Sequence, residues 1–96
     1  MVTRDLLTDS DVSAALDDLE DWTGDTGGIR RTVSCPSFGD AIRLVNAVAD
    51  AAEELDHHPD IDVRYKDVTF ALSTHSAGGV TAYDVEMAKR IDRLVG

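Results

Sequence analysis

The stretch FGDAIRLVNAVADAAEEL, residues 38–55, constrains the fold more than any other part of this sequence. It is rich in Ala and Leu and has no internal proline, so it predicts one long helix. Its apolar side chains form two stripes, which are Ile42, Val45, Ala49 and Ala52, and Leu44, Val48, Ala51 and Leu55. Two stripes make a band wider than an amphipathic helix needs to cover one surface. We therefore expect this helix to contact a sheet on one side and another helix or another subunit on the other.

Two further helices are predicted, one near each end of the chain. Residues 9–20 carry apolar side chains at helical spacing, and Ser10 or Asp11 is placed to cap the start. The second of these helices is predicted over residues 82–94. Thr81 is its expected N-cap, and Asp84, three positions on, would complete a variant of the capping box. The side chains that the last helix is expected to bury are Val85, Ala88, Ile91 and Val95.

The segments between the helices have strand patterns. Residues 29–35 alternate apolar and polar side chains up to Pro36, and TGDTGG at 23–28 reads as a turn. Residues 61–65 and 68–75 read as two strands joined by a tight turn at 66–67. In the second of them, one face carries Val68, Phe70, Leu72 and Thr74.

These elements predict the order α-β-β-α-β-β-α. Hairpin-joined strands with separate helices are typical of an α+β fold. We expect a four-stranded antiparallel sheet with three helices packed on one face, formed by residues 1–96 as a single domain.

The charge balance excludes several classes of function. The formal net charge is −10, with 19 acidic residues against 9 Lys and Arg. This balance argues against nucleic acid and against anionic membrane surfaces, which are both bound through clusters of Lys and Arg. The single cysteine, Cys35, leaves no internal disulfide, and no signal peptide or membrane-spanning run is evident. We expect a cytoplasmic protein.

The acidic surface also predicts a response to salt. Like charges repel each other at low ionic strength and are screened at high ionic strength. Urea unfolding is therefore expected to show higher stability in molar KCl than in low salt, as in a host with a salty cytoplasm. Equal stability in the two buffers would contradict this expectation.

The three histidines, His57, His58 and His75, form the most distinctive pattern. His57 and His58 follow the long helix, with acidic residues on both sides, and Pro59 favours an extended backbone at His58. The predicted hairpin places residue 63 opposite residue 70 and residue 59 opposite residue 74. His58 and His75 would then meet across the strand ends, and all three imidazoles could share one pocket.

Three interpretations of this cluster compete. The histidines could be exposed at a helix end, where the helix dipole favours a cation. They could bind a metal, although adjacent histidines rarely chelate one ion and the sequence has no HxxxH or CxxC spacing. They could instead form a metal-free acid/base site, because imidazole transfers protons near neutral pH.

A resemblance favours the acid/base site. The block EELDHHPDIDVRYKDVTFALSTHSAGGVTAYDVEMA, residues 53–88, resembles the pterin-4a-carbinolamine dehydratase family. The resemblance rests on a Glu followed by His-His-Pro, a Tyr and an apolar strand, then Thr-His, a short Gly loop, and a Thr with an Asp in the last helix. It extends without a gap back to Phe38, and Trp22 falls where the family has a tryptophan.

The resemblance implies an enzyme that removes water from 4a-hydroxytetrahydropterin and gives a quinonoid dihydropterin, with no metal or organic cofactor. It implies that His57, His58 and His75 are the catalytic or substrate-contacting histidines, without saying which is acid and which is base. The implied partner is a small-molecule pterin.

Other residues are candidates for substrate binding or support, each with an ordinary alternative. Glu53 lies four residues before His57, one helical turn away, and could orient that ring. It could also be a surface acid, and Asp56 has the same two alternatives. Asp84 matches an Asp of the family and could also serve only the helix start. Trp22 could stack on a pterin or lie in the core, and Pro59 more simply sets the backbone direction.

One departure from the family concerns the substrate. Ile61 stands where family members often carry an aromatic residue, which leaves the identity of the pterin open. Two alternative functions therefore stay in view. One is a non-catalytic oligomerisation or interaction module that uses the wide apolar face of helix 38–55. The other is a pterin-binding protein of another pterin pathway. The wide face also predicts a homodimer or homotetramer.

Overall fold

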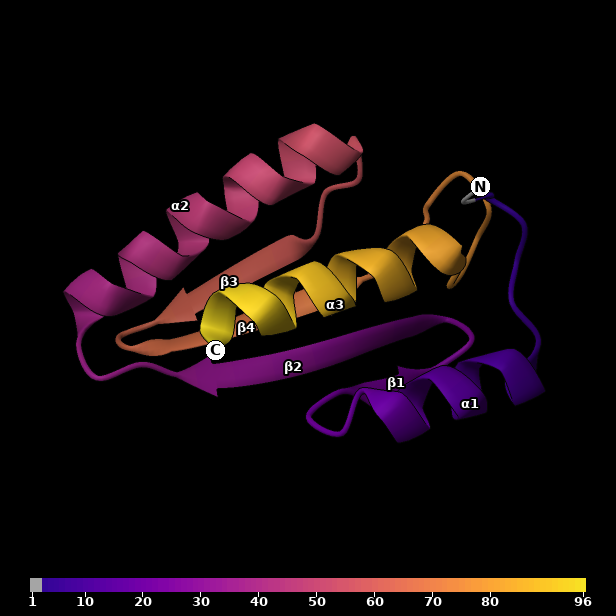
Figure 1. The fold of residues 1–96 in the computed structure, drawn as a ribbon, viewed down its shortest axis with the longest axis horizontal. Helices are drawn as coiled ribbons and strands as arrows, with labels where there is room; N and C mark the ends of the chain where they lie inside the picture. The colour runs from indigo at the N-terminus through magenta and orange to yellow at the C-terminus, as the bar shows by residue number, and fades with distance from the viewer. Residues whose placement is uncertain (1–2) are drawn as a thin grey trace.

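The computed structural model describes residues 3–96 and contains three helices and four strands (Figure 1). The elements are α1 (Asp9–Asp18), β1 (Thr23–Asp25), β2 (Gly28–Ser34), α2 (Phe38–Leu55), β3 (Asp60–Arg64), β4 (Asp67–Leu72) and α3 (Ala82–Val95). The predicted order α-β-β-α-β-β-α is confirmed.

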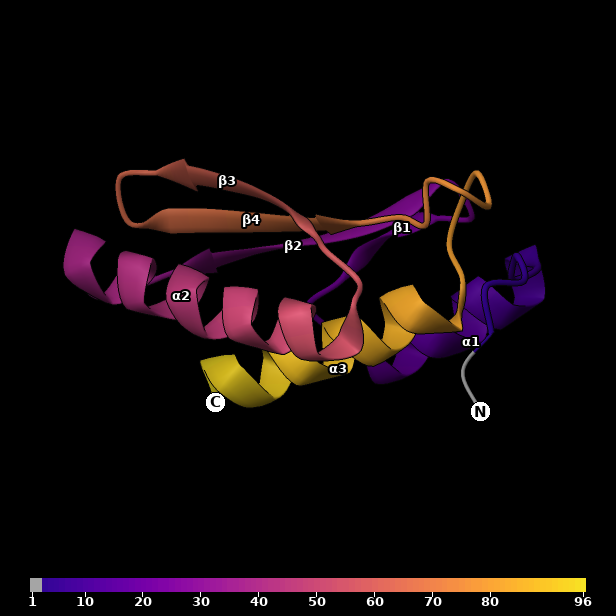
Figure 2. The same cartoon turned by 90° about the horizontal axis from the view of Figure 1, so that it is seen from above.

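The strands form one antiparallel sheet in the order β1-β2-β4-β3, and the three helices lie together on one face of it (Figure 2). The other face is open. The predicted α+β architecture is therefore confirmed. Among residues 3–96 no helix has the length and apolar character needed to cross a membrane.

The core lies between the sheet and the helices, as the alternation in the strands predicts. Ile29 and Val33 of β2 and Val68, Phe70 and Leu72 of β4 are buried on the helix side. The helices contribute the buried side chains Val12, Ala41, Val48, Ala52, Met87, Ala88 and Ile91. Met87 was not among the predicted core residues of the last helix, and Val85 and Val95 are only half-buried.

The two apolar stripes of α2 have different surroundings. Val48 is fully buried, and the helix packs beside α3, which supplies the second helix that the wide band predicts. The other predicted stripe is divided, because Ala52 is buried and Val45 is half-buried against the core, whereas Ile42 and Ala49 are exposed. Phe38, one turn before Ile42, is 51% exposed. We call Phe38, Ile42, Val45 and Ala49 the outer stripe of α2.

Two details near the N-terminus differ from the predictions. The prediction that Ser10 or Asp11 caps α1 is wrong, because the N-cap is Thr8. Its hydroxyl accepts from the Asp11 backbone N–H, and the Asp11 carboxylate accepts from the Thr8 N–H, which completes a capping box. The TGDTGG segment, read as a turn, also contains β1, which pairs with the start of β2.

The hairpin of β3 and β4 has a different register from the predicted one. Val63 lies opposite Val68 rather than opposite residue 70, and Arg64 lies opposite Asp67. The cause is Tyr65, whose φ of 53° closes the turn earlier than predicted. A shift by two positions keeps every side chain on its predicted face, so the burial pattern is unaffected.

A polar cluster lies beneath the sheet, away from the histidines. The Trp22 indole N–H donates to Asp92 Oδ1 at 2.8 Å, and Arg31 Nη1 donates to the same oxygen at 2.6 Å. Trp22 is 3% exposed. This tryptophan therefore belongs to the core, which was one of its two predicted roles.

Candidate functional site

The three histidines line one open hollow at the end of the sheet where β4 finishes and β3 begins. Its volume is about 250 Å³. The residues that line it are Arg4, Asp56, His57, His58, Ser73, Thr74, His75 and Ser76. The sequence thus placed the three imidazoles together correctly, although the hairpin register that suggested it was wrong.

The end of α2 determines where His57 points. Asp56, the C-cap, has left-handed backbone angles of φ 53° and ψ 44°, so the chain turns back over the last turn of the helix. The His57 backbone N–H donates to the Ala52 carbonyl at 3.0 Å, which fixes the turn. As a result His57 faces inward and is only 6% exposed.

Asp84 is the polar partner of the buried His57. One carboxylate oxygen, Oδ1, lies 2.5 Å from His57 Nε2. The other, Oδ2, accepts from the Thr81 backbone N–H and from the Thr74 hydroxyl, both at 2.8 Å. Asp84 is fully buried, so every one of these hydrogen bonds replaces water that the carboxylate has lost.

The hydrogen positions in this network follow from its connections. Thr74 donates its only hydroxyl hydrogen to Asp84, so Thr81, 2.7 Å away, must donate to the Thr74 oxygen. A carboxylate with two other donors accepts from His57, which places a hydrogen on Nε2. The other ring nitrogen of His57, Nδ1, then makes no hydrogen bond to Asp84.

Asp84 also caps the start of α3 together with Thr81, as predicted. The Thr81 hydroxyl and the Asp84 carboxylate form a complete capping box. The two roles weighed for Asp84, helix start and site residue, are therefore both present in its contacts. The same side chain couples the start of α3 to the end of α2.

His58 has a different environment from His57. Its side chain is 56% exposed, and Nε2 lies 3.1 Å from Oε2 of Glu53. The expected partner of Glu53 was His57, one helical turn later. That spacing fails because the helix ends at Leu55 and Asp56 reverses the chain, which brings His58 back toward Glu53.

His75 lies at the start of a tight loop that returns from β4 to α3. The Thr74 carbonyl accepts from the backbone N–H groups of Ala77 and Gly78, at 3.0 and 2.9 Å. Gly79 passes so close to the β1–β2 turn that a Cβ there would lie 2.4 Å from the Thr26 carbonyl oxygen. This packing fixes the loop, while His75 itself remains exposed to the hollow.

Two residues that the sequence did not single out complete the surroundings of His57. The Tyr83 ring lies 5.6 Å from the His57 ring, between centroids, at a tilt of 41°. The Arg4 guanidinium carbon lies over the Tyr83 ring, 4.6 Å from its centre. Tyr83 carries a weak sequence signal, since it directly precedes Asp84, whereas Arg4 carries none.

Other candidate residues are spread around or beyond the hollow. Asp56 lines it, Glu53 reaches it through His58, and Pro59 lies in the chain just after it. Trp22 does not line it. Within residues 3–96 no group of three or more His, Cys, Asp or Glu side chains is arranged to hold a metal ion.

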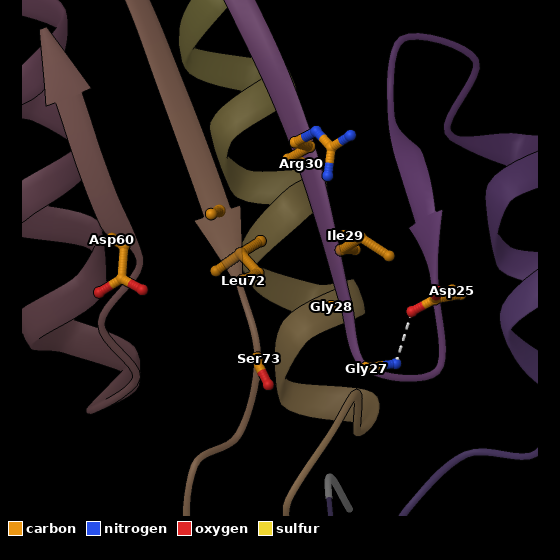
Figure 3. A pocket seen from close by; sticks show the side chains of 9 residues that line it. Asp25, Gly27, Gly28, Ile29, Arg30, Asp60, Leu72 and Ser73 are labelled. Atoms are coloured by element: carbon orange, nitrogen blue, oxygen red, sulfur yellow. Dashed lines mark hydrogen bonds between the residues drawn. The ribbon is translucent and has the colours of Figure 1, made fainter.

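A second hollow of about 300 Å³ lies on the open face of the sheet. Figure 3 shows Arg30 and Asp60 on either side of the strand that carries Leu72, with Ser73 at the end of that strand. Ser73 also lines the histidine hollow, so the two hollows adjoin. None of the side chains from residues 3–96 that line this second hollow is a histidine.

Comparison with known proteins connects this geometry to a family. The family model for pterin 4 alpha carbinolamine dehydratase matches residues 5–94. A protein of Nocardia farcinica, provisionally named a pterin-4-alpha-carbinolamine dehydratase, is 54% identical over 93 residues, which cover 97% of this chain and 98% of the relative.

Two solved structures have the same fold. One is described as a transcriptional coactivator/pterin dehydratase from Brucella melitensis, with a TM-score of 0.90, 35% identity, and coverage of 94% of this chain and 98% of the other. The second is a pterin dehydratase-like protein identified as a RuBisCO assembly factor in the alpha-carboxysome. Its TM-score is 0.64 at 22% identity, over 78% of this chain and 87% of that one, and it is evidence of the fold alone.

Proposed function

The chain belongs to the pterin 4 alpha carbinolamine dehydratase family, and from this membership we propose that it removes water from a 4a-hydroxytetrahydropterin. The product is a quinonoid dihydropterin. The observation that carries the proposal is the gathering of His57, His58 and His75 around one hollow of about 250 Å³. Family membership alone leaves activity open, because the fold also occurs in a protein identified as an assembly factor.

The reaction requires two proton transfers. The C4a–O bond breaks as a general acid protonates the leaving hydroxyl, which departs as water. The N5–H bond gives its proton to a general base as the C4a=N5 double bond forms. Positioned imidazoles can perform both transfers, each typically contributing about 10²–10⁴-fold to the rate.

The environments of the three imidazoles support a division of labour. Asp84 fixes the orientation and the tautomer of the buried His57, so that ring presents Nδ1 as its free nitrogen. His58 and His75 are exposed and can exchange protons with water. In this proposal the buried imidazole and the two exposed imidazoles share the two proton transfers, one to the leaving hydroxyl and one from N5.

Stopped-flow mixing tests the proposal. A 4a-carbinolamine generated chemically is mixed with the protein in molar KCl, and formation of the quinonoid dihydropterin is followed by absorbance. The enzyme proposal predicts decay that is faster than in buffer and proportional to protein concentration. Pterin binding without accelerated decay would favour a pterin-binding protein of another pathway, and neither binding nor decay would favour an interaction module.

The outer stripe of α2 supports a second proposal, association of copies of this chain as a homodimer or homotetramer. Phe38 and Ile42 are large apolar side chains left 51% and 37% exposed. Large apolar side chains left exposed on a long helix are typical of a surface that another protein covers. This proposal is compatible with catalysis, and it is also the feature on which a purely interacting module would depend.

The association proposal predicts the effect of one charge in the stripe. Ile42→Glu should convert the oligomer into monomers, because it places a carboxylate in the apolar contact. Light scattering coupled to size exclusion measures the mass. Ser13→Glu, which adds the same charge on the exposed side of α1, is the matched control and should leave the mass unchanged. A monomeric wild-type protein would contradict the proposal.

A further inference from the structure

Among the described residues, 3–96, Arg4 is the only Lys or Arg that lines the histidine hollow. The chain has 9 such residues against 19 carboxylates, so a cation at this hollow is a feature that the overall composition does not favour. The other lining side chains are hydroxyl groups, imidazoles and Asp56. The position of Arg4 therefore introduces a charge that the histidine chemistry described above does not use.

The segment around Arg4 is attached to the fold. The Leu7 backbone N–H donates to the Val80 carbonyl at 2.9 Å, and Leu6 pairs with Thr81 as an isolated bridge. These contacts lay the N-terminal segment against the residues that lead into α3, as Figure 1 shows near the start of the chain. Arg4 therefore lies near the first turn of α3, where Asp84 contacts His57.

Tyr83 holds the guanidinium group at the hollow. The Arg4 Cζ atom lies 4.6 Å from the centre of the Tyr83 ring, and that ring lies 5.6 Å from the ring of His57. A guanidinium stacked on an aromatic face keeps its N–H donors directed outward at its edge. The contact with Tyr83 therefore holds Arg4 at the hollow that His57 also lines, without consuming its hydrogen-bond donors.

Arg4 has no carboxylate partner within residues 3–96. The ion pairs in this part of the chain involve five other arginines, which are Arg31, Arg43, Arg64, Arg90 and Arg93. Asp56 lines the same hollow but does not form an ion pair with Arg4. In a chain with this excess of acid, an arginine that is stacked beside a site and left without an anion is suited to bind an oxygen of a ligand.

We propose that Arg4, held on Tyr83, is a substrate-binding residue that donates hydrogen bonds to an oxygen of the pterin. Two parts of a pterin can supply that oxygen, the carbonyl of its pyrimidinone ring or an anionic group on its side chain. The chemistry of recognition is the same for both, and it is separate from the proton transfers of the histidines. The inference rests on the proposed dehydratase function and names the group that would position its substrate.

Steady-state kinetics of Arg4→Gln on two carbinolamines test the inference. One substrate has a neutral side chain and the other has a carboxylate on its side chain. We expect KM to rise by about tenfold, as for the loss of a charge-assisted hydrogen bond at a partly solvated site, while kcat stays within about twofold. A rise for both substrates assigns the ring carbonyl, and a rise for the carboxylated substrate alone assigns the side-chain anion.

Lys89→Gln is the matched control, because Lys89 is exposed on α3, lies outside the histidine hollow, and its loss changes the net charge equally. It should leave both KM values unchanged. KM values for Arg4→Gln equal to wild type on both substrates, or equal to those of Lys89→Gln, would overturn the inference.

A binding measurement separates this inference from the dehydratase proposal. If the wild-type protein does not accelerate dehydration, the proposed function fails, and calorimetric titration with a stable 7,8-dihydropterin still tests Arg4. Weaker binding by Arg4→Gln than by Lys89→Gln would support the binding role. Equal affinities, or no binding by any of the proteins, would overturn it.

Discussion

Replacing His75 with alanine should slow carbinolamine dehydration by about 10²–10⁴-fold, the usual contribution of one positioned general acid or base. The protein should remain as stable as before, because His75 is exposed and none of the side-chain hydrogen bonds within residues 3–96 involves it. Stopped-flow rates and urea unfolding of the same preparation measure the two quantities. This combination separates a chemical role from a structural one.

Free imidazole provides the control for this variant. The hollow is open to solvent, so added imidazole should enter the space left by His75→Ala and restore part of the rate. Ser13→Ala, an exposed change on α1, should lose no activity and gain nothing from imidazole. Dehydration at the wild-type rate in His75→Ala would remove His75 from the proposed machinery.

Replacing Asp84 with alanine should have the largest effect on stability, lowering the free energy of unfolding by about 3–5 kcal/mol. The carboxylate is fully buried and receives hydrogen bonds from Thr74 and Thr81 in addition to its contact with His57. Its removal leaves three buried donors without an acceptor and also removes half of the capping box of α3. Urea unfolding with a constant m-value measures the loss.

Asp84→Asn is the matched control for Asp84→Ala. The amide keeps the volume and one carbonyl oxygen, so it should cost less stability, while its N–H₂ group presents donors where the carboxylate accepts. Dehydration should nevertheless fall in Asp84→Asn, since the orientation and tautomer of His57 depend on a carboxylate at this position. A free energy of unfolding for Asp84→Ala within about 1 kcal/mol of the wild-type value would contradict a stabilising role for the Asp84 hydrogen bonds.

The fold could be predicted from the sequence largely because its signals are local. The apolar periodicity of residues 38–55 and the alternation in residues 29–35 each specify one element without reference to the rest of the chain. Thr81 and Asp84 form their capping box within one helical turn. The layer arrangement then follows, because strands and helices that are each apolar on one face bury those faces against one another.

The features that the sequence misplaced depend on single backbone conformations. Tyr65 and Asp56 both adopt positive φ, which is uncommon for residues other than glycine. Tyr65 shifts the hairpin register, and Asp56 sends His57 inward to Asp84 while Glu53 meets His58. Tyr gives no signal for such a conformation and Asp gives only a weak one, so spacing along an ideal helix or strand led to the wrong partners.

The surroundings of the site were less predictable than its histidines. The His-His-Pro and Thr-His segments are recognisable by their spacing, whereas Arg4 reaches Tyr83 only because the N-terminal segment runs back along the start of α3. Contacts between residues so far apart in the sequence depend on the complete fold. The same holds for Trp22, whose indole finds Asp92 near the opposite end of the chain.

We propose that one hollow holds a flat pterin among all three imidazoles. The imidazole resonances of the ¹⁵N-labelled protein can be followed by NMR during titration with a stable 7,8-dihydropterin. We expect the signals of His57, His58 and His75 all to shift along one saturable binding curve. Saturable binding that leaves the three imidazole signals unmoved would place the ligand elsewhere and rule out this binding site.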